Sequence, residues 1–286
     1  LLFSLVELQK MAARMGYSPD EVLAAAQSLY EKHKLTSYPR TECQYAPESE
    51  HRKAKAVLEK ITGNFGGAWS IPAGWDVSRK SDAWNDAKLA EHYAIIPLST
   101  SCPVGNLSPI ERNVYKLICR QYVAQFFPHF EYLATTLVAE VKDQSFKATG
   151  RAPTAEGWRV LFGGAEAAKK QRADADGSEQ DDLPAVKVGE TGLAGPIDIE
   201  AKQTKPPSRY TSITLLEAIE KAHLLVTDPK VKAKLKQVEG IGTAATRAAI
   251  IARAVQAKLV GEDRSGKVIT YYPTAKAFGY INCVPS

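Results

Sequence analysis

The apolar residues of this 286-residue chain change their spacing twice, and this change constrains the fold more than any other feature. They recur at helical spacing as far as Phe126, at every second position from Tyr132, and at helical spacing again from Thr211. Helical spacing is typical of helices that bury one face, and alternation is typical of half-buried strands. The sequence therefore predicts an α+β protein of several domains, with helices on both sides of a β-rich segment.

Helix starts are marked by a Ser followed three residues later by Glu, a pattern that caps exposed backbone N–H groups. It occurs at Ser4, Ser18 and Ser108. The first two helices have a helix-turn-helix outline, which is more often packing than DNA reading. A further helix is predicted over residues 48–62.

The middle of the chain predicts an antiparallel sheet, with strands over residues 133–141, 145–150 and 158–162. Residues 165–184 are rich in Ala, Asp, Gln and Glu and predict a loop or an acidic insertion. Near the C-terminus, a helix over residues 244–259 precedes a hairpin punctuated by glycine. A helix followed by a hairpin is typical of a winged-helix domain.

Composition excludes some classes of protein. The net charge is +5 and the pI is near 8.9, which permits a polyanionic partner without requiring one. The four cysteines form no C-x-x-C pair, so we expect neither a zinc site nor a disulfide framework, and a reduced cytoplasmic setting. No apolar run reaches membrane-spanning length, and the first residues lack the basic segment and cleavage site that are typical of a signal peptide. The start at Leu1 rather than Met suggests a fragment or a processed product.

The run Leu35-Thr36-Ser37-Tyr38-Pro39-Arg40-Thr41-Glu42 places a phenol two residues from a guanidinium. Pro39 favours a short extended segment, on which Tyr38 and Arg40 would face the same way. A neighbouring cation favours the phenolate and screens an anionic target, so the pair suits attack on a phosphodiester. Packing of Tyr38 in a core or at an edge is an open alternative. His92 lies in the apolar segment 91–97 and, taken alone, is more often a structural residue than a catalyst.

The motif Gly240-Ile241-Gly242-Thr243 precedes a predicted helix, as in sites where backbone N–H groups bind an anion. Thr246 and Arg247, in the first turn, could contact the same phosphate. A plain glycine-rich helix start with Thr243 as its cap is an equally good interpretation. Residues 261–268 differ from a nucleotide phosphate loop because Val268 replaces its hydroxyl residue and a helix precedes it, so we exclude that function.

Together these segments resemble the type IA DNA topoisomerases, most closely the bacterial and plasmid topoisomerase III group. The resemblance covers nearly the whole chain apart from the acidic insertion. Thr243 stands where bacterial topoisomerase I often has Arg. The matching blocks are Phe3-Ser4-Leu5, Ala26-Gln27, Leu29-Tyr30-Glu31, Leu35 to Glu42, His92 to Pro97, Leu107-Ser108, Pro206 to Thr211 and Gly240 to Arg247.

The resemblance implies cleavage of one DNA strand, retention of its 5′ end as a phosphotyrosine, passage of another strand and resealing without ATP. Tyr38 would be the nucleophile, Arg40 would hold the scissile phosphate, and His92 would act beside it as a polar or proton-relay group. The residues implied to bind single-stranded DNA are Arg209, Tyr210, Thr243, Thr246 and Arg247.

The resemblance also implies three parts. Residues 1–128 would form a winged-helix-like catalytic domain that carries the tyrosine, residues 129–207 part of a β-rich gate arch, and residues 208–286 part of a helical or winged-helix DNA-groove domain. The amino-terminal Toprim domain, which carries the Mg²⁺ ligands of this family, is expected to lie outside this sequence. We therefore expect Mg²⁺ only in the complete enzyme, no metal bound by this chain, and no complete catalysis by it alone. The complete enzyme would be a monomer in the bacterial cytoplasm, associated with the nucleoid or a plasmid.

Two alternatives compete with this interpretation. The main one is a noncatalytic nucleic-acid-binding module built from winged helices, which would bind DNA in a salt-dependent way without a covalent adduct. A tyrosine recombinase is less compatible, because that group carries its tyrosine after its Arg and His residues and this chain has no H-x-x-R.

Overall fold

The computed structural model describes residues 1–141, 143–163, 206–238, 240–266 and 268–283, together with residues 183, 186–193, 195, 201 and 203–204. These form two compact units. The first contains residues 1–71, 76–126 and 208–286, and the second contains residues 72–75 and 127–207. The predicted acidic insertion at 165–184 lies outside the described residues except for Leu183. The mixture of helices and strands agrees with the predicted α+β class.

The capped helices form where the sequence predicts them. Helix α1 spans Leu5–Ala13, α2 spans Pro19–Glu31 and α5 spans Pro109–Val123. Complete capping boxes close the starts of α2 and α5, whereas at α1 only the Ser4 hydroxyl caps, because Glu7 pairs with Lys10 instead. These helices bury apolar stripes against one another and form the core of the first unit.

The helix predicted over residues 48–62 is interrupted. It forms as α3, Glu48–His51, and α4, Ala54–Phe65, with a turn at residues 52 and 53. Short 3₁₀ turns follow at Asp86–Lys88, Val104–Asn106 and Ala124–Phe126. Within residues 1–126, the β pairing consists of the isolated bridges Phe3 with Ile95, Thr36 with Pro97 and Ala46 with Trp84.

The C-terminal part of the first unit has its own small core. Its helices are α7 (Ser212–Glu220), α8 (Pro229–Gln237), α9 (Ala244–Gln256) and α10 (Ala275–Asn282). Its strands are β3 (Tyr210–Thr211), β4 (Val260–Asp263) and β5 (Thr270–Pro273). The strands pair antiparallel in the order β3-β5-β4. Buried side chains join the helices to the sheet, namely Leu216, Ile251, Ile269 and Tyr271. The predicted helix followed by a hairpin is therefore present as α9, β4 and β5.

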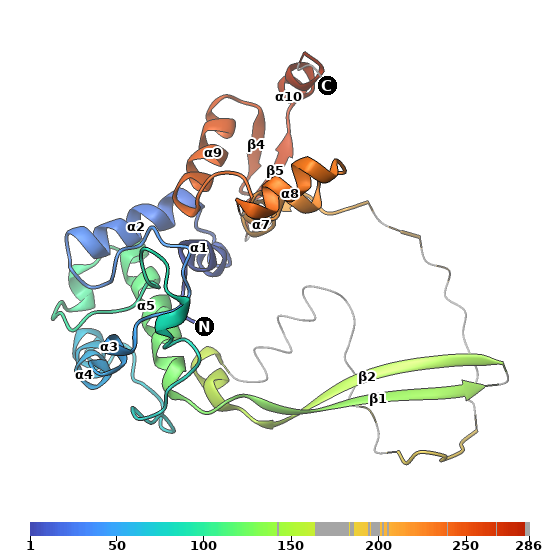
Figure 1. Cartoon of the computed structure of the whole chain (residues 1–286), viewed down its shortest axis with the longest axis horizontal. Coiled ribbons are helices and arrows are strands. Elements are labelled where there is room, and N and C mark those ends of the chain that lie inside the picture. Colours follow the sequence, from blue (N-terminus) through green and yellow to red (C-terminus); the bar gives the residue numbers. More distant parts are fainter. Residues whose placement is uncertain are drawn as a thin grey trace. The chain divides into compact units, whose positions relative to one another are not determined.

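Helices α1 and α2 pack against α7 and α9, as Figure 1 shows. Lys10 on α1 lies at the centre of this contact, with Nζ 2.8 Å from Glu7, 3.4 Å from Glu217 and 3.3 Å from Glu220. Burial disfavours the charged amine, but the hydrogen bond to Glu7 and the three carboxylates outweigh it and raise the pKa of Lys10. The charge is thus retained in a contact that joins the two ends of the chain.

The second unit is dominated by a hairpin of β1 (Glu131–Val141) and β2 (Gln144–Ala155), which run side by side in Figure 1. Leu133, Leu137 and Phe146 lie on one face of this ribbon, because Leu133 and Leu137 are four residues apart on β1 and Phe146 pairs with Ala139, two residues after Leu137. Leu133 is 65% exposed and Phe146 is 48% exposed, so this face has little cover within the described residues.

The prediction of a strand over residues 158–162 is wrong, because Gly157–Phe162 forms a 3₁₀ helix. Gly157 has φ +50°, and a Cβ there would lie 2.2 Å from the carbonyl oxygen of His129. The chain therefore turns sharply after β2. Leu161 is buried, and the Arg159 guanidinium lies 3.4 Å from the centre of the Phe130 ring. Alternating apolar residues indicated a strand, but the backbone of Gly157 prevents its continuation.

Glu111, at the start of α5, gives a prediction about acid stability. Burial disfavours its charge, but hydrogen bonds from Ser28 and Ser108, together with the charge of His33, lower its pKa from 4.5 to about 2. A lowered carboxyl pKa contributes stability that is present above pH 4.5 and is lost as the pH falls toward 2. We expect the free energy of unfolding of the natural chain to approach that of Glu111→Gln as the pH falls through this window. Glutamine is a suitable control because it also completes a capping box. Denaturant titration at several pH values measures the difference, and a constant gap between the two proteins would contradict the assignment.

Candidate functional site

The segment that carries Tyr38 crosses the first unit as extended but irregular chain. The strand expected at residues 38–40 is not formed, and the isolated bridge of Thr36 with Pro97 lies before it. Backbone hydrogen bonds run from Ser37 N to Ile96 O at 2.9 Å and from Leu98 N to Leu35 O at 2.8 Å. Pro39 has no N–H and cannot continue such a ladder. The segment is therefore paired with residues 96–98 at its start, and at its end the Thr41 carbonyl accepts from Leu5 N at 2.9 Å, with no ladder between.

Two buried hydroxyls replace the missing ladder. The Ser37 hydroxyl donates to Ala94 O and accepts from Ile96 N, each at 2.9 Å. The Thr41 hydroxyl donates to His92 O at 2.8 Å. Ser37 is 5% exposed and Thr41 is 3% exposed, so these bonds are largely shielded from water. They hold the backbone on both sides of Tyr38 against residues 92–96, and we call this arrangement the hydroxyl clamp.

The clamp places the Tyr38 ring beside His92. Their ring centres are 4.6 Å apart at an interplanar angle of 56°. Tyr30 of α2 meets the Tyr38 ring edge-on, with the centres 5.4 Å apart. Tyr38 is half-buried and His92 is exposed. Two of the residues predicted to be catalytic are thus brought together although they are far apart in the sequence.

Arg40 is exposed and contacts α2, with Nε 3.4 Å from Oε1 of Gln27. The expectation that Tyr38 and Arg40 share one face of a strand fails, because the strand is absent. The structure instead directs Tyr38 to His92 and Arg40 to Gln27.

The glycine motif at residues 240–243 ends at the N-terminus of α9. Gly240 has φ +96°, and a Cβ there would lie 2.2 Å from the carbonyl oxygen of Glu220, so this glycine permits close packing against the end of α7. Thr243 is the N-cap, and its N–H donates to the Thr246 hydroxyl at 2.7 Å. Both threonines are exposed. The motif therefore forms a capped helix start, and the two threonine hydroxyls lie at the surface.

Arg247 is 2% exposed. Its Nε donates to Ile241 O at 3.3 Å, and its Nη1 lies 3.7 Å from Oε1 of Glu42. Arg247 thus joins α9 to the residues just after Arg40, and in this conformation its side chain does not lie at the surface.

Arg209 and Tyr210 lie at the start of the C-terminal part. Both are exposed, and Tyr210 pairs with Tyr271 in the β3-β5 ladder. The Arg209 guanidinium lies 4.9 Å from the centre of the Tyr272 ring. A cation over an aromatic ring at the surface is compatible with binding to nucleic acid.

Several site residues were not identified from the sequence pattern. Gln27 and Tyr30 share a face of α2, three residues apart, and Glu42 reaches Arg247. The three-residue spacing of Gln27 and Tyr30, beside the buried stripe of α2, is the sequence feature that could have indicated a shared face next to the Tyr38 segment. The contact of Glu42 with Arg247 joins distant segments and has no local signal.

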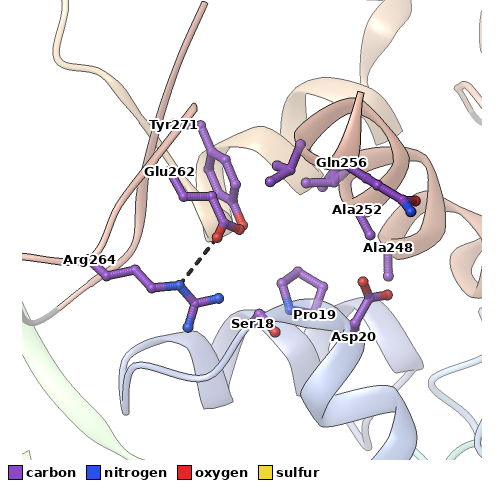
Figure 2. A pocket seen from close by; sticks show the side chains of 11 residues that line it. Ser18, Pro19, Asp20, Ala248, Ala252, Gln256, Glu262, Arg264 and Tyr271 are labelled. Carbon is purple, nitrogen blue, oxygen red and sulfur yellow. Dashed lines mark hydrogen bonds and ion pairs between the residues drawn. The ribbon is translucent and has the colours of Figure 1, made fainter. Parts of the chain in front are cut away.

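A pocket of about 230 Å³ lies between the start of α2 and the α9, β4 and β5 elements (Figure 2). Asp20 faces α9 across it, and Arg264 contacts Glu262 at 3.2 Å. Burial, with the nearby Glu21 and Glu262, raises the pKa of Asp20. None of the predicted site residues lines this pocket, so it is separate from the Tyr38 region.

Among the residues that the structure describes, no group of three or more His, Cys, Asp or Glu is placed to hold a metal ion. The described side chains therefore form no Mg²⁺ site. None of the described helices is long and apolar enough to cross a bilayer.

Comparison with known proteins gives a consistent result. A family model described as DNA topoisomerase matches residues 1–285. DNA topoisomerase 3 of Vibrio cholerae is 37% identical over 287 residues, which is 100% of this chain and 42% of that protein. The proteins of the same name from Pasteurella multocida and Bacillus subtilis are 36% and 33% identical, over 88% and 99% of this chain and 37% and 38% of their own lengths. The chain thus spans about two fifths of the length of these relatives.

Removal of the clamp hydroxyl tests its contribution to stability. We expect Ser37→Ala to lower the free energy of unfolding by about 1–3 kcal/mol, because the buried Ala94 carbonyl and Ile96 N–H both lose a partner. Ser49→Ala, at an exposed position in α3, is the matched control and should have little effect. Denaturant unfolding measures both, and equal effects would show that the hydroxyl contributes nothing specific.

Proposed function

This chain belongs to the DNA topoisomerase family, and we propose that it supplies the strand-cleaving part of a type IA enzyme of the topoisomerase 3 kind. The observation that carries the proposal is the position of Tyr38, half-buried between Tyr30 and His92 on a segment held by the hydroxyl clamp. A nucleophile is most effective when its backbone is fixed before the substrate arrives.

The proposed step is a transesterification. The phenolic oxygen of Tyr38 attacks the phosphorus of a single DNA strand, and a phosphotyrosine bond forms as the bond to the 3′ oxygen of the neighbouring nucleotide breaks. The phenol gives up its proton and the departing 3′ oxygen gains one. Attack of that 3′ hydroxyl on the phosphotyrosine reverses the step, so the energy of the phosphodiester bond is retained and resealing needs no ATP.

His92 is the proposed polar or proton-relay group, since its exposed ring lies against the Tyr38 ring. Arg40 is proposed to hold the scissile phosphate. Its contact with Gln27 uses Nε, and we propose that its terminal guanidinium nitrogens bind the phosphate oxygens as charge develops.

For the DNA strand we propose contacts from the two exposed threonines of α9, Thr243 and Thr246, and from Arg209 and Tyr210. Arg247 would contact DNA only after its interaction with Glu42 opens. An incoming phosphate could compete with the Glu42 carboxylate for this guanidinium, which would connect strand binding on α9 to the Tyr38 segment.

We propose three functional parts at the expected boundaries. Residues 1–128 would be the winged-helix-like catalytic part, 129–207 a portion of the gate arch, and 208–286 a portion of the DNA groove. The helix and hairpin made by α9, β4 and β5 support a winged-helix description of the last part. The Mg²⁺ ligands are proposed to lie in the remainder of the full-length protein, which would act as a monomer on cytoplasmic DNA in the nucleoid or on a plasmid.

A covalent adduct assay tests the nucleophile. In the full-length protein that contains this segment, with Mg²⁺ and labelled single-stranded DNA, we expect a denaturant-stable protein-DNA adduct that Tyr38→Phe abolishes while DNA binding persists. Phenylalanine keeps the ring packed against His92 and removes only the oxygen. Tyr45→Phe is the matched control, since Tyr45 is also half-buried and follows Tyr38 closely in the sequence. An adduct that survives Tyr38→Phe would defeat the proposal, and DNA binding without any adduct in the natural protein would favour a noncatalytic binding module.

Arg40→Ala tests the phosphate contact. We expect cleavage to fall on the order of 100-fold, as when one donor to a developing charge is lost, while the unfolding transition stays unchanged because Arg40 is exposed. Arg14→Ala removes an exposed cation elsewhere and is the control for net charge. Single-turnover cleavage rates decide between these outcomes, and equal rates for Arg40→Ala and Arg14→Ala would exclude the phosphate role.

A further inference from the structure

A second group of reactive side chains lies in the first unit and has no part in the proposed cleavage reaction. His33 follows α2, Cys102 lies in the loop before α5, and Glu111 is in the first turn of α5. His33 Nδ1 lies 3.9 Å from Cys102 Sγ, and His33 Nε2 lies 3.4 Å from Glu111 Oε1. The imidazole thus stands between a thiol and a carboxylate, and we call these three residues the thiol cluster.

The carboxylate of the cluster is fixed and ionised. The Ser28 hydroxyl donates to Glu111 Oε1 at 2.6 Å, and the Ser108 N–H donates to Oε2 at 2.8 Å. These bonds are part of the reason that the pKa of Glu111 is lowered to about 2 although burial opposes its charge. Glu111 therefore remains an anion at neutral pH, with both oxygens oriented by α2 and α5.

An anion beside Nε2 determines how the imidazole is used. It favours a proton on Nε2, which leaves the lone pair of Nδ1 for the thiol proton of Cys102. The His33 side chain is 10% exposed, so little water competes for either nitrogen. Nε2 lacks a well-aligned hydrogen bond within the described structure, but it lies at ion-pair distance from Glu111. The pair would strengthen once the imidazole became a cation.

The residues on both sides of Cys102 in the sequence are exposed. Cys102 is partly exposed, and its neighbours Ser101 and Pro103 line a pocket of about 360 Å³. Lys60 also lines this pocket and donates to the Ser101 hydroxyl at 3.0 Å. The thiol has one competing acceptor, the Pro103 carbonyl, also at 3.9 Å. Cys102 is not among the residues that line this pocket, so the access of a small reagent to the sulfur depends on the partial exposure of Cys102 itself.

We propose that Cys102 is a nucleophilic modification site, with His33 as its base and Glu111 as the positioning residue for His33, and that it reacts with small hydroperoxides. The thiol proton moves to His33 Nδ1, and the sulfur attacks the terminal peroxide oxygen. The S–O bond forms as the O–O bond breaks, and the departing alkoxide or hydroxide takes the proton from the imidazolium. Cysteine is oxidised by two electrons to the sulfenic acid, and the hydroperoxide is reduced to an alcohol or water.

The other three cysteines provide internal references. Cys43 and Cys119 are buried, and burial raises the pKa of the Cys119 thiol. Cys283 is exposed. A rate set by exposure alone would make Cys283 the fastest of the four, whereas activation by His33 would make Cys102 the fastest.

The experiment treats the full chain with hydrogen peroxide, traps sulfenic acids with a dimedone-type reagent, and measures the rate at each cysteine by peptide mass mapping. We expect Cys102 to react faster than Cys283 in the natural protein. His33→Gln should slow Cys102 on the order of 100-fold, the lower end of the effect of a positioned general base. Glu111→Gln should slow it less, and His129→Gln, an exposed histidine of the other unit, should leave it unchanged. The rate at Cys283 should not change in any variant.

Cys43 and Cys119 report on folding in the same samples, because unfolding of a variant would expose them to the reagent. If His33→Gln exposes them, two tests of the proposal remain. One compares the rates at Cys102 and Cys283 in the natural protein, and the other measures the rate at Cys102 in Glu111→Gln. Slower reaction at Cys102 than at Cys283 in the natural protein overturns the proposal, as does an unchanged Cys102 rate in a folded His33→Gln.

Discussion

The hydroxyl clamp is the interaction on which the rest of the candidate site depends. Residues 35–42 include Pro39 and form no regular strand, so the backbone on either side of Tyr38 has no continuous ladder to hold it. The Ser37 and Thr41 hydroxyls take over that role from buried positions, and both bond to the backbone of residues 92–96. Side-chain bonds of this kind fix one register only, because each hydroxyl must reach a particular carbonyl. The contact between the Tyr38 and His92 rings follows from that register, and Tyr30 of α2 closes the other side.

Local chemistry explains which parts of the fold were predictable. Capping boxes act over three residues, so the starts of α2 and α5 could be predicted from Ser18 and Ser108 alone. The strand predicted over 158–162 failed at one glycine, whose left-handed backbone is invisible to a pattern of apolar residues. The contacts of Tyr38 with His92 and of Arg247 with Glu42 join distant segments. No spacing rule covers such pairs, and only the resemblance to a family had placed Tyr38 and His92 in one site.

The glycine motif before α9 shows how one sequence can fit two interpretations. As a pattern, Gly240-Ile241-Gly242-Thr243 indicates an anion site. In the fold, however, residues of this motif make contacts within the protein. Gly240 permits the close approach of Glu220, Thr243 and Thr246 cap the helix, and the Ile241 carbonyl accepts from Arg247. The buried Arg247 then reaches Glu42, two residues beyond Arg40. The DNA contact proposed for this helix start would therefore be energetically coupled to the position of the Tyr38 segment, because a phosphate that drew Arg247 outward would break its ion pair with Glu42.

The thiol cluster is attached to the same two stretches of chain as the hydroxyl clamp. His33 is five residues before Tyr38, and Cys102 is five residues after Pro97, which bridges Thr36. Between His33 and the clamp, Lys34 has φ +54°, a backbone conformation that L residues rarely adopt. Movement of a neighbouring residue does not easily change this conformation. An oxygen added to Cys102 Sγ must be accommodated beside a side chain that is nine-tenths buried. If His33 moved to make room for this oxygen, it would press either on α5, which Glu111 anchors through its capping box, or on residues 34–37, which lead to Tyr38. The first of these is held by hydrogen bonds to both Glu111 oxygens and the second by the two hydrogen bonds of the Ser37 hydroxyl, so the start of α5 and the segment that carries the tyrosine both resist such a displacement.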